Sequence, residues 1–131
     1  MAIFGIGAIY EEDVSDDFLN ENIACIGWEE NDAPPAHSIL RHLRPGDIIF
    51  IKSFAPHVGL TIKAVGIVME GKVQKHNDLG TCVPVRWVWK GEERIGKIDD
   101  KWPVRSVTIY EEHHPKVQRK VLELLLSKVY K

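Results

Sequence analysis

The sequence of 131 residues has no long hydrophobic run and no typical targeting segment. No apolar stretch approaches the ~20 residues that a membrane-spanning helix needs, and the N-terminus lacks a basic segment followed by an apolar one. We therefore expect neither a transmembrane helix nor a signal peptide, and we predict a cytoplasmic protein with no membrane partner. Hydrophobic residues make up 44% of the chain, which is enough for one core, so we expect a single domain over residues 1–131.

Cysteine is scarce, with two residues in the whole chain. Cys25 and Cys82 lie in apolar surroundings without the spacing of a zinc site, which disfavours both a zinc ribbon and a disulfide-rich secreted scaffold. Because Cys25 stands between Ala24 and Ile26, we interpret it as a small buried hydrophobic residue.

The sequence also lacks the common catalytic and metal-binding signatures. It contains no HExxH motif, no nucleophile elbow and no glycine-rich phosphate loop. The densest histidine cluster, at residues 111–114, precedes a helix-opening proline, and neighbouring side chains on a strand point to opposite faces, so we interpret it as an exposed cap. The sequence therefore predicts no metal, no cofactor and no catalytic residue, and it favours a non-enzymatic function.

Charge is unevenly distributed along the chain. Residues 1–50 carry ten acidic and two basic side chains, whereas residues 51–131 carry nine acidic and fifteen basic ones. A net-acidic domain has a low non-specific affinity for nucleic acid, because non-specific affinity comes mostly from neutralising phosphates. The simplest interpretation is that these are solvated surface charges and that the basic part folds back against the acidic part. The alternative is a local basic face in the second part.

Short apolar segments separated by turn residues predict an α+β domain around a curved or closed sheet. Proline is tolerated in the first turn of a helix, so we expect one helix to begin at Pro34 and another at Pro115. We expect the acidic residues 11–17 to form a solvated loop that Phe18 anchors to the core. The expected strands cover residues 3–10, 23–28, 48–51, 60–69, 83–89 and 105–110, and we expect a polar loop over residues 71–80. Because Gly66 lies inside the run at 60–69, that run is either one long strand or a bulged pair. The apolar face of the last helix comprises Val117, Val121, Leu124, Leu125 and Val129.

The four tryptophans are candidates for a ligand site as well as for the core. Trp87 and Trp89 are two residues apart on an expected strand and should share one face, while Trp28 ends a strand before an acidic turn. Aromatic planes beside a cleft can stack on a nucleobase. From spacing alone, packing in the core is the better interpretation for each of them, including Trp102.

Several blocks of the sequence resemble the EVE-type branch of the PUA-like superfamily. The most specific are Ile-Gly-Trp-Glu at residues 26–29 and Gly-Asp-x-x-x-x-Lys-Ser at residues 46–53. The chain is similar in particular to the N-terminal reader modules of modification-dependent restriction enzymes and of related AAA-type ATPases. The blocks span about residues 3–90; the others are Phe-Gly-Ile-Gly-Ala at 4–8, Phe-Leu at 18–19, Ile-Lys-Ala-Val-Gly-Ile-Val at 62–68 and Val-Arg-Trp at 85–87.

This resemblance implies a small PUA-like β-barrel with flanking helices and a pocket for one flipped base, including a modified base, of DNA or RNA. On the matching positions, Trp28 and Trp87 become candidate walls of the pocket, with Trp89 beside them. Lys52 and Ser53 lie where the strand-end motif of the family meets the ligand, so they are candidates to donate to a phosphate or to a base edge. We expect the domain to act alone or with an effector protein supplied in trans.

Two other functions remain as alternatives. One is a protein-interaction module whose surface recruits a partner. The other is a small nuclease or hydrolase of the related ASCH branch that would use Lys52 with a neighbouring acid such as Asp47. We instead predict a structural role for Asp47, because a carboxylate in a Gly-Asp turn commonly accepts backbone N–H bonds.

Overall fold

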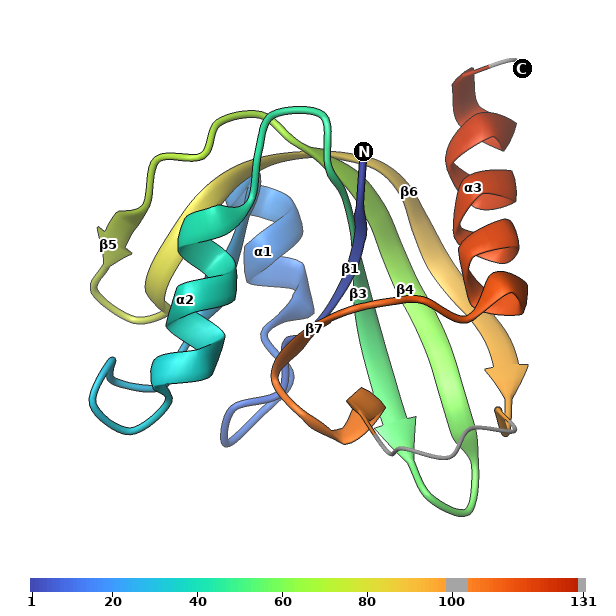
Figure 1. Ribbon diagram of the computed structural model, residues 1–131, viewed down its shortest axis with the longest axis horizontal. Coiled ribbons are helices and arrows are strands. Elements are labelled where there is room, and N and C mark those ends of the chain that lie inside the picture. Colours follow the sequence, from blue (N-terminus) through green and yellow to red (C-terminus); the bar gives the residue numbers. More distant parts are fainter. Residues whose placement is uncertain (99–103, 130–131) are drawn as a thin grey trace.

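The computed structural model describes residues 1–98 and 104–129 and shows an α+β fold (Figure 1). A curled mixed sheet forms a half-barrel with the strand order β2-β6-β4-β3-β1-β7, and β5 pairs with β6 at one end. The expected α+β domain with a curved sheet is thus confirmed. Trp102, which was expected to pack in the core, lies outside the described residues. The strands are β1 (Ile3–Gly7), β2 (Ile23–Ile26), β3 (Ile48–Ala55), β4 (Gly59–Val68), β5 (Gln74–His76), β6 (Gly80–Gly96) and β7 (Ile109–Glu111), and the helices are α1 (Ser15–Glu21), α2 (Pro34–His42), η1 (Val104–Ser106) and α3 (Pro115–Val129).

Helices cover both faces of the sheet, with α1 and α2 on one side and α3 on the other (Figure 1). Successive residues of β3 alternate between the two cores, as the period of a strand requires. Ile49 and Ile51 pack in the core with α1 and α2, whereas Ile48 and Phe50 pack in the core with α3. A strand buried on both faces explains why the segment before Lys52 is continuously apolar. Among the described residues, no helix combines the length and the apolar character needed to cross a membrane.

The predicted helix starts at Pro34 and Pro115 are confirmed. The apolar face of α3 also packs as expected, because Val117, Val121 and Leu125 are buried against the sheet, while Val129 is exposed. The first turns of both helices accept proline because the backbone N–H groups there have no partner within the helix.

The acidic segment 11–17 was expected to be a loop, which holds for residues 11–14, whereas residues 15–17 belong to α1. The Asp13 carboxylate accepts the backbone N–H of Ser15 at 2.8 Å and its hydroxyl at 2.5 Å, just as the helix begins. Phe18 is completely buried, which confirms its predicted role as an anchor. The prediction failed over residues 15–17 because the burial of one aromatic side chain outweighs the low intrinsic helix propensity of aspartate.

The two tryptophans of β6 do not share a face, contrary to the strict alternation that the sequence predicted. Trp87 lies opposite Gly66 of β4 and Trp89 lies opposite Val65, so that Val88 is the additional residue of a bulge. Trp87 packs against the core under α1 and α2, whereas Trp89 packs against the core under α3. Alternation over residues 83–89 was therefore wrong after Trp87, because a bulge shifts the pleat.

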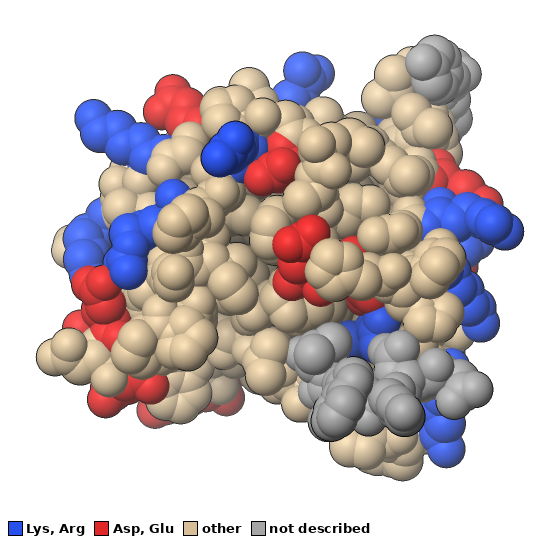
Figure 2. Space-filling view, in the orientation of Figure 1, with Lys and Arg blue, Asp and Glu red and all other residues tan. Residues whose placement is uncertain are grey.

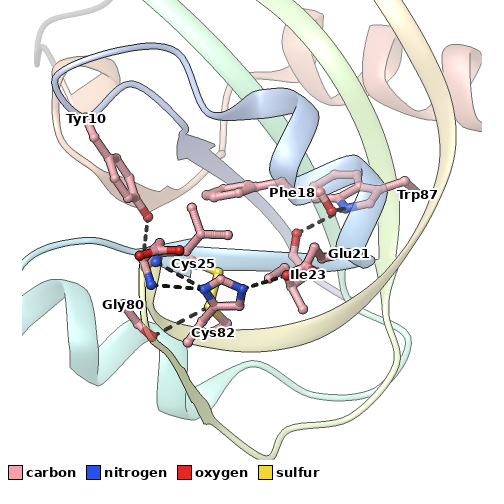
Figure 3. The surroundings of a disulfide bond; sticks show 11 residues. Tyr10, Phe18, Glu21, Ile23, Cys25, Gly80, Cys82 and Trp87 are labelled. Carbon is pink, nitrogen blue, oxygen red and sulfur yellow. Dashed lines mark hydrogen bonds and ion pairs between the residues drawn. A yellow bond between two sulfur atoms is a disulfide. The ribbon is translucent and has the colours of Figure 1, made fainter.

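A disulfide bond joins β2 to β6 through Cys25 and Cys82 (Figure 3). The two residues lie opposite each other in the antiparallel ladder, with Cα atoms 4.0 Å apart, and both are buried. The burial of Cys25 was predicted, but its interpretation as a free hydrophobic residue was wrong. The partners are 57 positions apart, and only the pairing of β2 with β6 brings them together.

Removing this disulfide should destabilise the protein substantially. In the chain-entropy description, a cross-link between residues this far apart lowers the entropy of the unfolded chain. This effect stabilises the folded protein by roughly 4 kcal/mol. We expect Cys25→Ala/Cys82→Ala to lower the free energy of unfolding by about that amount in urea titrations. Reductant should lower the stability of the parent similarly and leave the double variant unchanged, whereas equal stability of the oxidised and reduced parent would contradict the pairing.

Asp47 ties the turn before β3 to the N-terminus. Its Oδ1 accepts the backbone N–H of Ala2 at 3.1 Å, and its Oδ2 accepts the backbone N–H of Arg44 at 2.8 Å. The carboxylate is therefore occupied by the backbone on both oxygens, which confirms the predicted bonding in the Gly-Asp turn.

Replacing Asp47 by alanine should lower the free energy of unfolding by about 1–2 kcal/mol, because two backbone donors lose their acceptor. Asp47→Asn, which keeps one acceptor oxygen, should lose less. Thermal and urea unfolding measure the effect, and full stability of Asp47→Ala would refute the structural role.

Candidate ligand cleft

A cleft of about 720 Å³ opens where β1 and β3 end beside the segment between η1 and β7. The parallel pairing of β1 with β3 places Gly7 opposite Lys52, and the backbone N–H of Gly7 donates to the carbonyl of Thr108 at 2.8 Å. These contacts join three distant parts of the sequence at one end of the sheet. The cleft is lined by Gly7, Ile9, Tyr10, Glu11, Gly27, Trp28, Lys52, Ser53, Phe54, Ser106, Val107 and Thr108.

Trp28 presents its side chain at the mouth of this cleft and is 59% exposed. It follows β2 directly, and its carbonyl accepts a hydrogen bond of 2.7 Å from Nε2 of the buried His37 on α2. An ion pair between Arg41 of α2 and Glu30 holds the same loop. A tryptophan of the core would be buried, whereas an exposed tryptophan on an anchored loop is typical of a binding surface.

Tyr10 is a second aromatic residue of the cleft, and the sequence analysis missed it. Its hydroxyl donates to the carbonyl of Leu79 at 2.6 Å, and burial raises the pKa of this phenol to about 12. A Cβ atom on Gly27 would lie 2.9 Å from the Tyr10 ring, so the absence of a side chain lets the ring rest on the backbone beside Trp28. The position of Tyr10 just after the Gly-Ile-Gly strand was the available signal.

Lys52 reaches the cleft from β3 but is only 8% exposed. Its Nζ donates to the carbonyl of Arg105 at 2.7 Å and lies 5.9 Å from the centre of the Tyr110 ring. In the described part of the chain, no carboxylate lies within 4.0 Å of this ammonium group. Desolvation therefore lowers the pKa of Lys52 to about 8.

A buried ion pair supports the segment that accepts this lysine. Nε of Arg105 donates to Oε1 of Glu112 at 3.0 Å, and Nη2 of Arg105 donates to Oε2. Both side chains are almost fully buried. The expectation of an exposed cap at residues 111–114 was thus wrong for Glu112, because the charge of Arg105 compensates its burial.

The cleft brings together three of the five predicted ligand-binding residues. Trp28, Lys52 and Ser53 line it, and Ser53 is half-buried. Trp87 lies instead under α1, where its indole N–H contacts the carbonyls of Phe18 and Ile23, each at 3.1 Å (Figure 3). Trp89 packs against the core under α3.

The arrangement separates Asp47 from Lys52. Asp47 directly precedes β3 and Lys52 lies within it, five residues further along the chain, which corresponds to roughly 16 Å along a strand. Both oxygens of Asp47 accept backbone N–H groups. The pair that a nuclease of the ASCH type would require is therefore not brought together at the cleft.

Acidic and basic side chains are both spread over the surface, with local groups of each kind. Figure 2 shows acidic side chains at the lower left, below α2, and basic side chains at the right edge beside α3. Two acidic residues of the first part do pair with the second part, Asp13 with Lys63 and Glu21 with His76.

A comparison with protein-family models finds no match for this chain, and neither does a comparison with curated proteins.

The buried ammonium of Lys52 should make stability depend on pH. Its folded-state pKa of about 8 is below the ordinary value, so above pH 8 the unfolded chain binds more protons than the folded protein. The free energy of unfolding should therefore rise between pH 8 and 10, by about 1–2 kcal/mol after allowing for partial solvent screening. Urea titrations should show this rise in the parent and its loss in Lys52→Met. A parallel pH profile of both proteins would contradict the assignment, and the window stops at pH 10 because the phenols of an unfolded chain titrate at about that pH.

Proposed function

We propose that this protein is a non-catalytic nucleic-acid-binding module that captures a single flipped base, including a modified base, in the cleft beside Trp28. The observation that carries the proposal is the combination of the exposed Trp28 ring at the mouth with the buried ammonium of Lys52, which has a backbone acceptor but no carboxylate within 4.0 Å among the described residues. The resemblance of residues 26–29 and 46–53 to EVE-type domains of the PUA-like superfamily supports the same function.

The size and chemistry of the cleft support a planar ligand. Pockets for small ligands typically enclose about 300–1,000 Å³ and combine apolar walls with a few polar groups. Here the apolar side chains of Ile9, Trp28 and Phe54 accompany the polar groups of Lys52 and Ser53. Base stacking on an aromatic plane contributes ~1–3 kcal/mol per base, and the lysine and serine supply hydrogen bonds to a base edge.

The charge near the cleft bears on how nucleic acid would approach. Glu11 lines the cleft, and an acidic rim disfavours non-specific phosphate binding. Affinity would therefore depend on the captured base more than on the backbone. This balance suits a reader that ignores most of the strand and responds to one nucleotide.

The proposed cytoplasmic location depends on the redox state of Cys25 and Cys82. Reducing compartments keep most thiols free, and disulfides persist mainly in oxidising ones. Counting reactive thiols in denatured protein, taken from cells without exposure to air, distinguishes the two states. Two free thiols support the cytoplasmic location, and none favours an oxidising compartment.

Single substitutions of Trp28 and Trp87 form a matched test of the cleft. Trp28→Ala should weaken binding of short single-stranded RNA or DNA about ten- to a hundredfold, because a stacking plane is lost. It should leave the melting temperature unchanged, since the side chain is exposed. Trp87→Ala should lower the melting temperature, because Trp87 packs in the core and donates to two carbonyls.

Fluorescence anisotropy at low salt measures the affinities, and Trp28→Phe should keep most of the binding. If Trp28→Ala binds as tightly as the parent, the stacking role is refuted. If no oligonucleotide binds the parent at low salt, the result favours a protein-interaction module.

A further inference from the structure

We propose that Lys52 reads the inward edge of the captured base and selects an oxo group over an amino group, namely at position 6 of a purine or position 4 of a pyrimidine. This inference rests on the proposed base-capturing function. It specifies the class of base that the cleft would bind, namely oxo-purines and oxo-pyrimidines, and it identifies Lys52 as the residue that determines this specificity.

The first step concerns the unused donors of Lys52. A lysine ammonium has three N–H donors and no acceptor, and one donor is accounted for by the bond of 2.7 Å to the carbonyl of Arg105. No carboxylate of the described residues neutralises the charge within 4.0 Å. A buried charge without a counter-ion is costly, and a ligand acceptor within the cleft would satisfy it.

The second step concerns the depth of this group. Lys52 is 8% exposed, whereas Ile9 and Trp28 at the mouth are about 60% exposed. The ammonium group lies close to the backbone of β1, because a Cβ atom on Gly7 would be 3.7 Å from Nζ. Lys52 therefore meets the part of a ligand that enters deepest, and a phosphate of the strand, which stays outside, is poorly placed to reach it.

The third step concerns the orientation of a flipped base. The sugar and the phosphate backbone must face the mouth of the cleft, so the base edge farthest from the glycosidic bond enters first. That edge carries position 6 of a purine or position 4 of a pyrimidine. Guanine and thymine present a carbonyl acceptor there, whereas adenine and cytosine present an amino donor.

The fourth step concerns discrimination. A carbonyl oxygen accepts from the ammonium group, whereas an amino group places donor against donor and leaves the buried charge unsatisfied. Sites that hydrogen-bond a ligand group strongly reject an analogue that cannot make the bond. The other charged groups near Lys52 do not substitute for it, since Arg105 is paired with Glu112 and burial beside Glu112 raises the pKa of Tyr110.

The experiment compares strands that differ at one base. An oligoadenylate heptamer carries one central hypoxanthine or retains adenine, and a second pair carries one central uracil or cytosine, each as RNA and as DNA. The parent should bind the oxo member of each pair at least about tenfold more tightly. Lys52→Met, which keeps most of the aliphatic stem, should lower the affinity for the oxo strand to that for the amino strand. Lys72→Met, an exposed lysine outside the cleft, is the matched control and should keep the preference.

Each alternative result has a definite meaning. Equal binding of oxo and amino strands by the parent overturns the inference without any variant, while the base-capturing function stands if Trp28→Ala still loses affinity. An equal loss for all strands in Lys52→Met, with a salt dependence flattened by about one charge, assigns Lys52 to a phosphate and also overturns the inference. Absence of binding to every strand overturns the proposed function together with the inference.

Discussion

The parallel pairing of β1 with β3 is the constraint on which the rest of the structure depends. It places the N-terminal strand between β3 and β7, with Gly7 beside Lys52 and Gly5 beside Phe50 and Tyr110. A Cβ atom on Gly5 would lie 2.6 Å from the Tyr110 ring and 2.8 Å from the Phe50 ring. The two glycines of β1 thus differ: Gly5 admits aromatic rings into the core, whereas a Cβ atom on Gly7 would make only an ordinary contact of 3.6 Å with the stem of Lys52.

The aromatic side of the cleft depends on a different set of long-range contacts. The disulfide fixes β2 against β6, and β2 leads directly into Gly27 and Trp28. His37 then holds the carbonyl of Trp28 from α2. The cross-link and the helix therefore restrain Trp28 from both sides, and a ligand that stacks on an already ordered ring loses less conformational freedom on binding.

Local sequence features predicted the parts of the fold that local chemistry determines. The proline at the start of α2, the apolar spacing of α3 and the turn-forming Asp47 each depend on nearby residues, and each was predicted. The partner of Cys25, the burial of Glu112 and the separation of Trp87 from Trp89 depend on strand register and on a bulge. Gly66 marked a position where a bulge could form, but a short segment encodes neither the register nor which strand carries the extra residue, and a shift of one residue exchanges the faces of a strand. For the same reason the sequence identified Trp28, Lys52 and Ser53 individually but could not show that Tyr10 joins them.

The energetics of the cleft distinguish Lys52 from the other buried charges of this fold. Arg105 and Glu112 are both buried, and each has the opposite charge of the other at hydrogen-bonding distance. Lys52 follows the wholly apolar first half of β3, yet among the described residues its ammonium group has one acceptor, the carbonyl of Arg105. A methionine of similar length would fill the same space without the desolvation cost. Retaining a charge at such a position is understandable if the missing partner comes from a ligand, because binding then compensates the cost that folding leaves uncompensated.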